Sequence, residues 1–454
     1  MTPPDPSLLG PLIAQLRLAR GWSQQRLADT LCAAAGTPTL TRHEVSRWER
    51  AVRVPGERWR RHLVAVLDAP AGLLGDAPTR SRPPGPATAA RSRSALLALA
   101  RRWAADPSAP LLLNPATIDH VAGPPPDPAS DPTGSPPGGP PSGAFGLAEL
   151  RRLDDLAGGA DLAPAGAYRL RRVARALRRC GPAGRRRLLP ALAEAAQLAG
   201  WLDGDAGDLA AGLAAHRLGL RAAAATGDRA FAGHVLGSAS HLLAGAGDAE
   251  GALLLARAGY AGARRAGSPG LRTLLLHRVA LAAALAGRTP AGRQALDAAR
   301  RAAETVDPAT EPAWLYWLDG DELAAMTGRT LVALGRPGPA VPLLHAAGSA
   351  RGPRSASVYG GWLARGLLQL GEVDQAAAVA GAALHDAVRA GSTRATAALV
   401  EVDRRLTAHR AEPAVRRWRR LLADARPYLP RASAPRRPAT TRRPRGRAGP
   451  PRTG

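Results

Sequence analysis

The sequence predicts an all-α protein in which a small N-terminal unit of short helices precedes a long array of paired helices. Ala, Leu and Val supply most of the apolar residues, and aromatic residues make up only 4% of the chain. This composition favours packed helices, because strands prefer β-branched and aromatic side chains. Residues 7–75 carry apolar side chains at helical spacing, and turn glycines recur at long intervals between residues 147 and 429. The two patterns predict two different helical domains.

The 454 residues are too many for one ordinary domain. Changes in composition divide them into a compact helical unit at 7–75, a Pro/Gly/Arg-rich linker with one short helix around Leu96 to Trp103 at 76–146, a helical region at 147–429, and an Arg-rich tail at 430–454. The tail and most of the linker bury too little apolar surface to fold alone, so we expect them to be disordered.

The formal net charge of +26 favours a polyanion, such as nucleic acid, as a partner. The sequence contains no Lys, so all 62 basic residues are Arg. Together with the abundance of Ala, Gly and Pro, this also indicates the codon usage of a GC-rich genome, which accounts for part of the excess charge. The charge therefore supports a nucleic-acid partner without identifying it.

The sequence lacks the patterns of enzymes and metal proteins. Its two cysteines, Cys32 and Cys180, form no disulfide framework and no paired-cysteine metal motif. Nucleotide-binding glycine loops, nucleophile elbows and zinc-protease motifs are missing. His234 and His241 are seven residues apart and could share one helix face, which we interpret as structural. We expect no catalytic residues, no cofactor and no bound metal.

The sequence also lacks a basic segment followed by a hydrophobic stretch at its start, so no signal peptide is expected. Its most apolar run, 274–286, is interrupted by His277 and Arg278 and is too short to span a bilayer. We therefore expect a cytoplasmic protein that does not insert into membranes.

The long helical region repeats around five glycines. They are Gly207, Gly247, Gly287, Gly335 and Gly371, spaced 40, 40, 48 and 36 residues apart. Small residues flank each glycine. The position seven residues before each turn glycine holds Gly200, Ser240, Ala280, Gly328 or Ala364. The position five residues after it holds Gly212, Ala252, Gly292, Ala340 or Ala376. The fourth unit is stretched by its longer interval.

This pattern predicts stacked helical hairpins. A glycine supplies the left-handed conformation that ends a helix, and two helices cross closely only where their side chains are small. A period near 40 residues suits a two-helix repeat. The region resembles tetratricopeptide repeats, which place small residues around a turn glycine, although the large aromatic residues of that family are mostly missing. The resemblance implies a curved α-solenoid.

The N-terminal unit predicts four short helices. The first carries apolar residues from Leu8 to Leu16 on one face and ends at Gly21, after which Ser23 is suited to cap the second helix. The third helix begins with Thr41 and Glu44, the pattern of a reciprocal capping box. Val45, Trp48, Trp59, Leu63 and Leu67 are expected in the core. A tight connection between the second and third helices indicates a helix-turn-helix.

The stretches WSQQRLADTL and TRHEVSRWERAVRVP resemble repressor/Cro-like regulators of the xenobiotic-response-element type, in particular members from GC-rich actinobacteria with a tetratricopeptide-like C-terminal half. The link from Ala28 to Val45 is longer than the family pattern, and we interpret it as an extended second helix followed by the loop 36–40. In this family the third helix lies in the major groove of DNA.

The resemblance implies base contacts by Arg42, His43 and Arg47. Arg can bind guanine O6 and N7 as a bidentate pair, and His can offer a single donor or acceptor. It also implies phosphate contacts by Gln24, Arg50 and Arg53. The alternative for each Arg is an ordinary solvated side chain. Glu44 and Glu49 are interpreted as structural acceptors.

A local concentration of aromatic and acidic residues stands out at 310–326, with Trp314, Tyr316, Trp317 and Asp319. Helical repeats bind partners along a concave surface, and aromatic rings beside acids suit a peptide or a cationic small molecule. These four residues are therefore a candidate effector groove. The alternative is that the bulky residues only fill a distorted repeat.

Together these patterns predict a sequence-specific DNA-binding transcriptional regulator. Its partners would be double-stranded DNA, a second copy of the chain in a homodimer, and a peptide, small-molecule or protein effector on the repeats. The competing interpretation is a protein–protein interaction adaptor with a degenerate helix-turn-helix domain.

Overall fold

The computed structural model describes a helical protein. It describes residues 10, 13, 14, 16–18, 20–50, 55, 57–67, 86–109, 111–123, 146–156, 158–349 and 352–429, and among them no strand occurs. The predicted all-α class is confirmed for these residues. The predicted tail at 430–454 and Arg53 lie outside the described residues. No described helix is long and apolar enough to cross a membrane.

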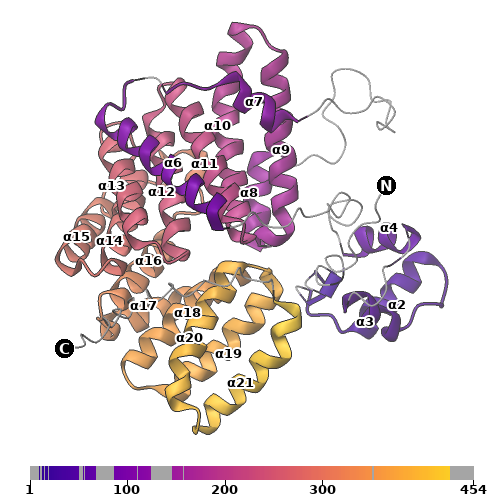
Figure 1. The fold of residues 1–454 in the computed structure, drawn as a ribbon. Helices are drawn as coiled ribbons and strands as arrows, with labels where there is room; N and C mark the ends of the chain where they lie inside the picture. The colour runs from indigo at the N-terminus through magenta and orange to yellow at the C-terminus, as the bar shows by residue number, and fades with distance from the viewer. Residues whose placement is uncertain are drawn as a thin grey trace, which may run out of the picture.

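Three helices near the N-terminus, α2 (Gln24–Ala35), α3 (Arg42–Glu49) and α4 (Glu57–Val66), surround one small core (Figure 1). Its buried side chains include Ile13, Leu27, Leu31, Val45, Trp48, Leu63 and Leu67. The predicted core residue Trp59 is partly buried and lies against Trp48, with ring centroids 6.1 Å apart. Residues 10, 13, 14 and 16–18 are also helical.

The ends of these helices agree in part with those that the sequence predicts. Ser23 caps α2, since its hydroxyl accepts a hydrogen bond from the Arg26 amide at 3.1 Å. Gly36 ends α2 in the left-handed conformation, with φ 65°, which confirms the extended second helix. Thr41 precedes α3, but its side chain makes no capping hydrogen bond, so the predicted capping box is wrong.

The region from residue 146 onward is a series of consecutive helices. They are α8 (Leu147–Leu156), α9 (Gly159–Arg179), α10 (Pro182–Asp205), α11 (Leu209–Ala225), α12 (Arg229–Gly245), α13 (Ala249–Ala263), α14 (Pro269–Leu285), α15 (Thr289–Ala303), α16 (Gly320–Ala333), α17 (Pro337–Ser349), α18 (Pro353–Gln369), α19 (Val373–Ala390), α20 (Thr393–Leu406) and α21 (Pro413–Ala425). Helices α10 and α11 pack as a pair, as do α12 and α13, α14 and α15, α16 and α17, and α18 and α19. The predicted hairpins are therefore present.

The five predicted turn glycines join the helices of these pairs. Gly207, Gly247, Gly287, Gly335 and Gly371 all have positive φ, between 69° and 91°. In the first two turns the next residue is an aspartate that caps the second helix. The Asp208 carboxylate accepts from the Ala211 amide at 2.9 Å, and the Asp248 carboxylate accepts from the Gly251 amide at 3.0 Å. Each Gly-Asp step thus ends one helix and begins another.

The small residues that flank the turn glycines lie where the two helices touch, as predicted. A Cβ on Gly200 of α10 would come within 2.8 Å of the Gly212 carbonyl oxygen of α11. In the next hairpin the Ser240 hydroxyl donates to the Ala252 carbonyl at 2.8 Å. Side chains larger than these would push the helices apart.

The predicted linker contains two helices rather than one short one. Helix α6 (Pro86–Ala105) packs against α11 and α13 and buries Leu96 and Trp103, and α7 (Pro115–Ala122) packs against α9. The first half of α6 has no apolar period, which is why the sequence does not reveal it. That half is held by tertiary contacts, including an ion pair between Arg93 and Asp248.

The longest interval between turn glycines corresponds to an added connection. Residues 304–319 join α15 to α16 and include the short 3-10 helix η2 (Ala313–Leu315). We call residues 304–319 the connecting segment. It contains the aromatic residues that the sequence singled out.

The two ends of the array meet. Asp205, at the end of α10, accepts hydrogen bonds from the Ser392 hydroxyl at 2.7 Å and from Arg394 Nε at 2.6 Å. The Asp205 carboxylate also accepts from the Gly159 amide at 2.8 Å. We call this contact between Gly159, Asp205 and residues 392–394 the seam. It closes the curved array, with α8 lying against α18 beside it.

Candidate functional site

Helix α3 exposes one face and buries the other. Arg42, His43 and Arg47 are exposed, whereas Val45 is 0% and Trp48 is 3% exposed. The three predicted base-contact residues are therefore available to a partner on the exposed side of one helix. Arg47 Nη1 lies 3.1 Å from the Glu44 carboxylate, in a pair whose arginine side chain is 54% exposed. Such exposed pairs contribute little and can be exchanged for another acceptor.

A buried ion pair fixes α3 against its neighbours. Arg17 donates from Nε and Nη2 to the two carboxylate oxygens of Glu49, at 2.6 and 3.0 Å. Gln24, at the start of α2, donates from Nε2 to the same carboxylate at 2.7 Å. Glu49 is 3% exposed, which confirms its predicted structural role. This network joins the first helical segment, α2 and α3.

The network changes the interpretation of Gln24. The sequence predicts a phosphate contact, but one amide hydrogen of Gln24 already binds Glu49, which leaves the second for another acceptor. Arg50 is exposed at the end of α3, and its Nε donates to the Ser46 carbonyl at 3.2 Å. Of the predicted phosphate contacts, Arg50 is the one with a freely accessible side chain in the described part of the chain.

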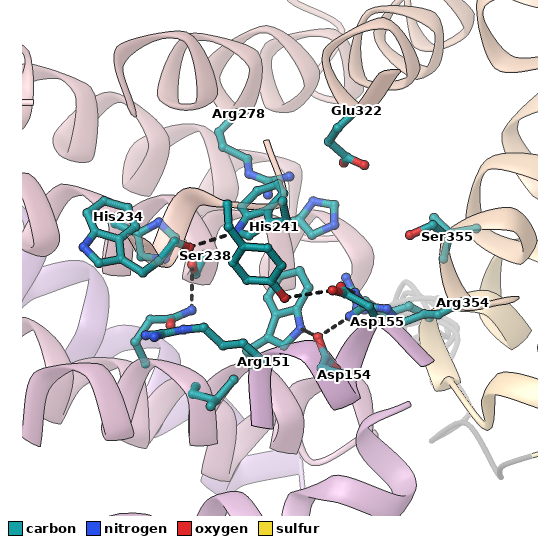
Figure 2. A pocket seen from close by; sticks show the side chains of 18 of the residues that line it. Arg151, Asp154, Asp155, His234, Ser238, His241, Arg278, Glu322, Arg354 and Ser355 are labelled. Atoms are coloured by element: carbon teal, nitrogen blue, oxygen red, sulfur yellow. Dashed lines mark hydrogen bonds and ion pairs between the residues drawn. The ribbon is translucent and has the colours of Figure 1, made fainter. Parts of the chain in front are cut away.

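A second candidate site lies inside the closed array. Alternate helices, namely α8, α10, α12, α14, α16, α18 and α20, line a cavity of about 120 Å³ that is partly open to solvent (Figure 2). We call it the central cavity.

Three of the four predicted groove residues line the central cavity. They are Trp314, Tyr316 and Trp317 of the connecting segment. Trp314 lies against Phe231 and His234 of α12, with ring centroids 5.3 and 4.5 Å apart. Trp314 therefore packs between helices and also forms part of the cavity wall. The first role matches the interpretation that the bulky residues fill a distorted repeat, and the second matches the interpretation of a candidate groove.

Asp319 does not line the cavity. It is the N-cap of α16, and its carboxylate accepts from the Glu322 amide at 2.8 Å. The connecting segment reaches α8 through Tyr316 instead, whose hydroxyl donates to the Asp155 carboxylate at 2.8 Å. Burial, and then this hydrogen bond, raise the pKa of Tyr316, so its hydroxyl remains a donor.

The acids on the seam side of the cavity have cationic partners. Arg354 pairs with Asp154 and with Asp155, and Arg394 pairs with Asp205. Burial raises the pKa of Asp154 and outweighs the charge of Arg354. Burial would also raise the pKa of Asp205, but Arg394, Arg354 and the hydrogen bond from Gly159 together lower it.

Histidines on the other wall are held neutral. His234 and His241 of α12 both line the cavity. Burial, followed by the charges of nearby arginines, lowers the pKa of each well below the usual value of 6.5. His241 also stacks on Trp201, with ring centroids 5.7 Å apart. The two histidines thus share one helix face, as the sequence suggests, and they line the cavity as uncharged rings.

Two further arginines line the cavity and, unlike Arg354 and Arg394, form no ion pair with an aspartate among the described residues. Arg278 of α14 is 6% exposed and Arg329 of α16 is 2% exposed, and both line the cavity. Nε and Nη1 of Arg278, and Nε and Nη2 of Arg329, have no hydrogen-bond partner in the described part of the chain. Burial, and next the charge of Arg329, lower the pKa of Arg278 to about 9, so its guanidinium stays charged at neutral pH.

Sequence reasoning missed these arginines and the seam. Arg278 and Arg329 are two among 62 identical side chains, and no local pattern marks them. Asp205 and Arg394 are far apart in sequence and come together only in the folded chain. One usable signal was the interruption of the apolar run 274–286 by His277 and Arg278, two polar residues that are 1% and 6% exposed.

The described residues contain no group of three or more His, Cys, Asp or Glu side chains that could hold a metal ion. No known family model matches the chain, and no curated protein or solved structure shows significant similarity to it. The resemblance to repressor/Cro-like regulators with tetratricopeptide-like repeats thus stays a prediction from the motifs themselves.

Proposed function

We propose that this chain is a sequence-specific DNA-binding transcriptional regulator, in which the N-terminal helices bind DNA and the helical array binds an effector. The observation that supports it most is the exposure of Arg42, His43 and Arg47 on one side of α3 while Val45 and Trp48 anchor the other side. A helix held in this way can enter a major groove with its arginines facing the base edges.

The buried network adds to this support. The ion pair between Arg17 and Glu49, joined by Gln24, restrains α3 relative to α2 without using any of the exposed cations. A rigidly held recognition helix loses little conformational entropy on binding. The net charge of +26 supplies the long-range attraction to a polyanion. This proposal includes a cytoplasmic, nucleoid-associated location and a homodimer that reads two half-sites.

The second candidate is a protein–protein adaptor whose N-terminal domain no longer binds DNA. The central cavity and the closed array favour a binding role for the C-terminal region under either proposal. The exposed arginines of α3 favour the regulator, because an adaptor would need no cationic face on this helix.

Selection of duplexes from a random pool by the full chain separates the two candidates. The regulator enriches a defined motif, and one with two related half-sites about one helical turn apart indicates a dimer. Washing at increasing salt removes duplexes held only by phosphate contacts. The absence of any enriched motif would reject sequence-specific binding and leave the adaptor.

A further inference from the structure

The central cavity holds more positive charge than its own acids neutralise. Arg354 and Arg394 have aspartate partners at the seam, and Arg151 pairs with Glu194 at 2.9 Å. Arg278 lies across the cavity from Asp154 and Arg151 (Figure 2), and Arg329 lines the same cavity.

The acid of the cavity lining that faces these two arginines is Glu322, and it already has a hydrogen-bond partner. Glu322 of α16 lines the cavity, and its carboxylate accepts a hydrogen bond from the Tyr359 hydroxyl. The charges of Arg278 and Arg329 are thus opposed by one carboxylate. Burying a guanidinium whose N–H groups lack partners costs free energy, and a bound ion is one of the reasons for which native proteins retain such groups.

The rest of the wall is aromatic. Trp201, Trp314 and Trp317 line the same space, and the histidines beside them are uncharged. Flat apolar groups pack well against such rings. The cavity therefore offers an oxyanion site next to aromatic rings.

We propose that the central cavity binds a small organic oxyanion, a carboxylate or a phosphate ester attached to a flat apolar group, and that Arg278 and Arg329 bind the oxyanion. Guanidinium groups suit both oxyanions because they donate paired hydrogen bonds to two oxygens. This differs from the cationic ligand or peptide that the sequence predicted from acids beside aromatics. Of those acids, Asp319 caps α16, and Asp155, which the fold brings to Tyr316, already binds Arg354 and Tyr316.

This inference deepens the regulator proposal by naming the ligand class of its effector site, but ligand binding can be measured without DNA. A full-length chain that binds oxyanions and enriches no DNA motif would contradict the regulator and leave the cavity assignment standing. The reverse result would contradict only the cavity assignment.

The test uses four probes on the full-length protein, each titrated to about 10 mM, a range that detects weak millimolar binding. Phenyl phosphate and phenylacetate present the two oxyanions on the same ring, phenethylammonium presents a cation on that ring, and inorganic phosphate lacks the ring. We expect phenyl phosphate or phenylacetate to raise the unfolding midpoint and to bind at least about tenfold more tightly than phenethylammonium. Which of the two binds better identifies the oxyanion, and weaker binding of inorganic phosphate indicates that the ring contributes.

Variants locate the site. Arg278→Gln and Arg329→Gln should each weaken binding of the better probe at least about tenfold, since each removes charge-assisted hydrogen bonds. Arg365→Gln is the matched control, because this partly buried arginine lies over the Trp362 ring at 3.9 Å and outside the cavity lining. If a substituted protein fails to fold, the wild-type titration still decides. No stabilisation by either aromatic oxyanion, tighter binding of phenethylammonium, or equal loss in Arg365→Gln would overturn the proposal.

Discussion

Asp205 and Arg394 lie 189 residues apart in sequence, yet their carboxylate oxygen and Nε are 2.6 Å apart at the seam. Asp205 is 0% exposed, and its carboxylate accepts from Arg394, Ser392 and Gly159 at once. A repeat array normally gains stability only between neighbouring units. Here one residue connects the beginning of the array to its end.

Asp205→Asn should therefore be strongly destabilising. The amide group removes the charge opposite Arg394 and places donors where the carboxylate had accepted hydrogen bonds. Breaking a buried pair in this way typically costs about 3–5 kcal/mol. Urea unfolding measures the loss. Arg404→Gln is the control, since Arg404 pairs with Glu401 on the surface and its loss should leave stability nearly unchanged. Similar effects of the two substitutions would show that the seam adds little.

Arg47→Ala tests the exposed face of α3. An arginine that binds guanine through two hydrogen bonds contributes about 1–3 kcal/mol at one base pair, so its removal should relax the preference at that position. Binding to a selected duplex and to its single-base variants, measured at fixed salt, gives the preference directly. Uniform weakening on every duplex would mean instead that Arg47 contacts a phosphate.

A pair of glycine substitutions tests the contact between paired helices. A Cβ on Gly200 would lie 2.4 Å from His216 Nδ1 and 2.8 Å from the Gly212 carbonyl oxygen, so Gly200→Ala should cost about 1–3 kcal/mol. Gly245 also lies in a helix, but nothing is within 4 Å of a Cβ built there. Gly245→Ala should be neutral or stabilise by up to about 1 kcal/mol. Thermal unfolding of both proteins makes the comparison, and equal midpoints would contradict the predicted close approach.

The fold was more predictable than the site for a physical reason. The turn glycines and their small neighbours recur because every hairpin meets the same local requirement, and Gly207 and Gly247 satisfy it in the structure. The sequence predicted only the second half of α6, because that half carries the buried residues, such as Leu96 and Trp103, and the first half has none among its described side chains.

The central cavity depends on closure of the array, which no local pattern encodes. The sequence identified Trp314, Tyr316 and Trp317, because aromatic residues are rare in this chain. It did not identify Arg278 and Arg329, since two guanidinium nitrogens of each lack a hydrogen-bond partner among the described residues, and residue type does not reveal this. The oxyanion proposed here differs from the cationic ligand or peptide that the neighbouring acids in the sequence suggested, because ion pairing is a property of the fold.

Acidification should destabilise the array through its buried histidines. Burial lowers the pKa of His216 to about 4 and of His277 to about 3, and it lowers those of His234 and His241 as well. Below about pH 6.5 the histidines of the unfolded chain, with ordinary pKa values near 6.5, bind protons, whereas the buried histidines of the folded chain stay unprotonated. Stability is therefore retained above about pH 6.5 and lost as the pH falls toward about 4.

The slope of this loss can be assigned to single residues. Each buried histidine contributes about 1.4 kcal/mol per pH unit between its unfolded and folded pKa values. His277→Leu should reduce the slope of unfolding free energy against pH by about that amount between roughly pH 4.5 and 6. A slope that is the same in wild type and in His277→Leu would contradict the assignment.

The hydrogen bond from Tyr316 to Asp155 predicts how the cavity releases its ligand. It joins the connecting segment to α8 at 2.8 Å, between residues 161 positions apart, and the Tyr316 side chain belongs to the cavity wall. Tyr316→Phe removes this hydrogen bond and keeps the ring. A partly exposed hydrogen bond contributes about 1 kcal/mol, so dissociation of the aromatic oxyanion should become roughly fivefold faster.

Tyr168→Phe, on the exposed surface of α9, should leave the rate unchanged. Because Trp314 and Trp317 line the cavity, stopped-flow tryptophan fluorescence can follow the release. If Tyr316→Phe and wild type release phenyl phosphate or phenylacetate at the same rate, the connecting segment does not control access to the cavity, and the ligand enters and leaves by another opening of the array.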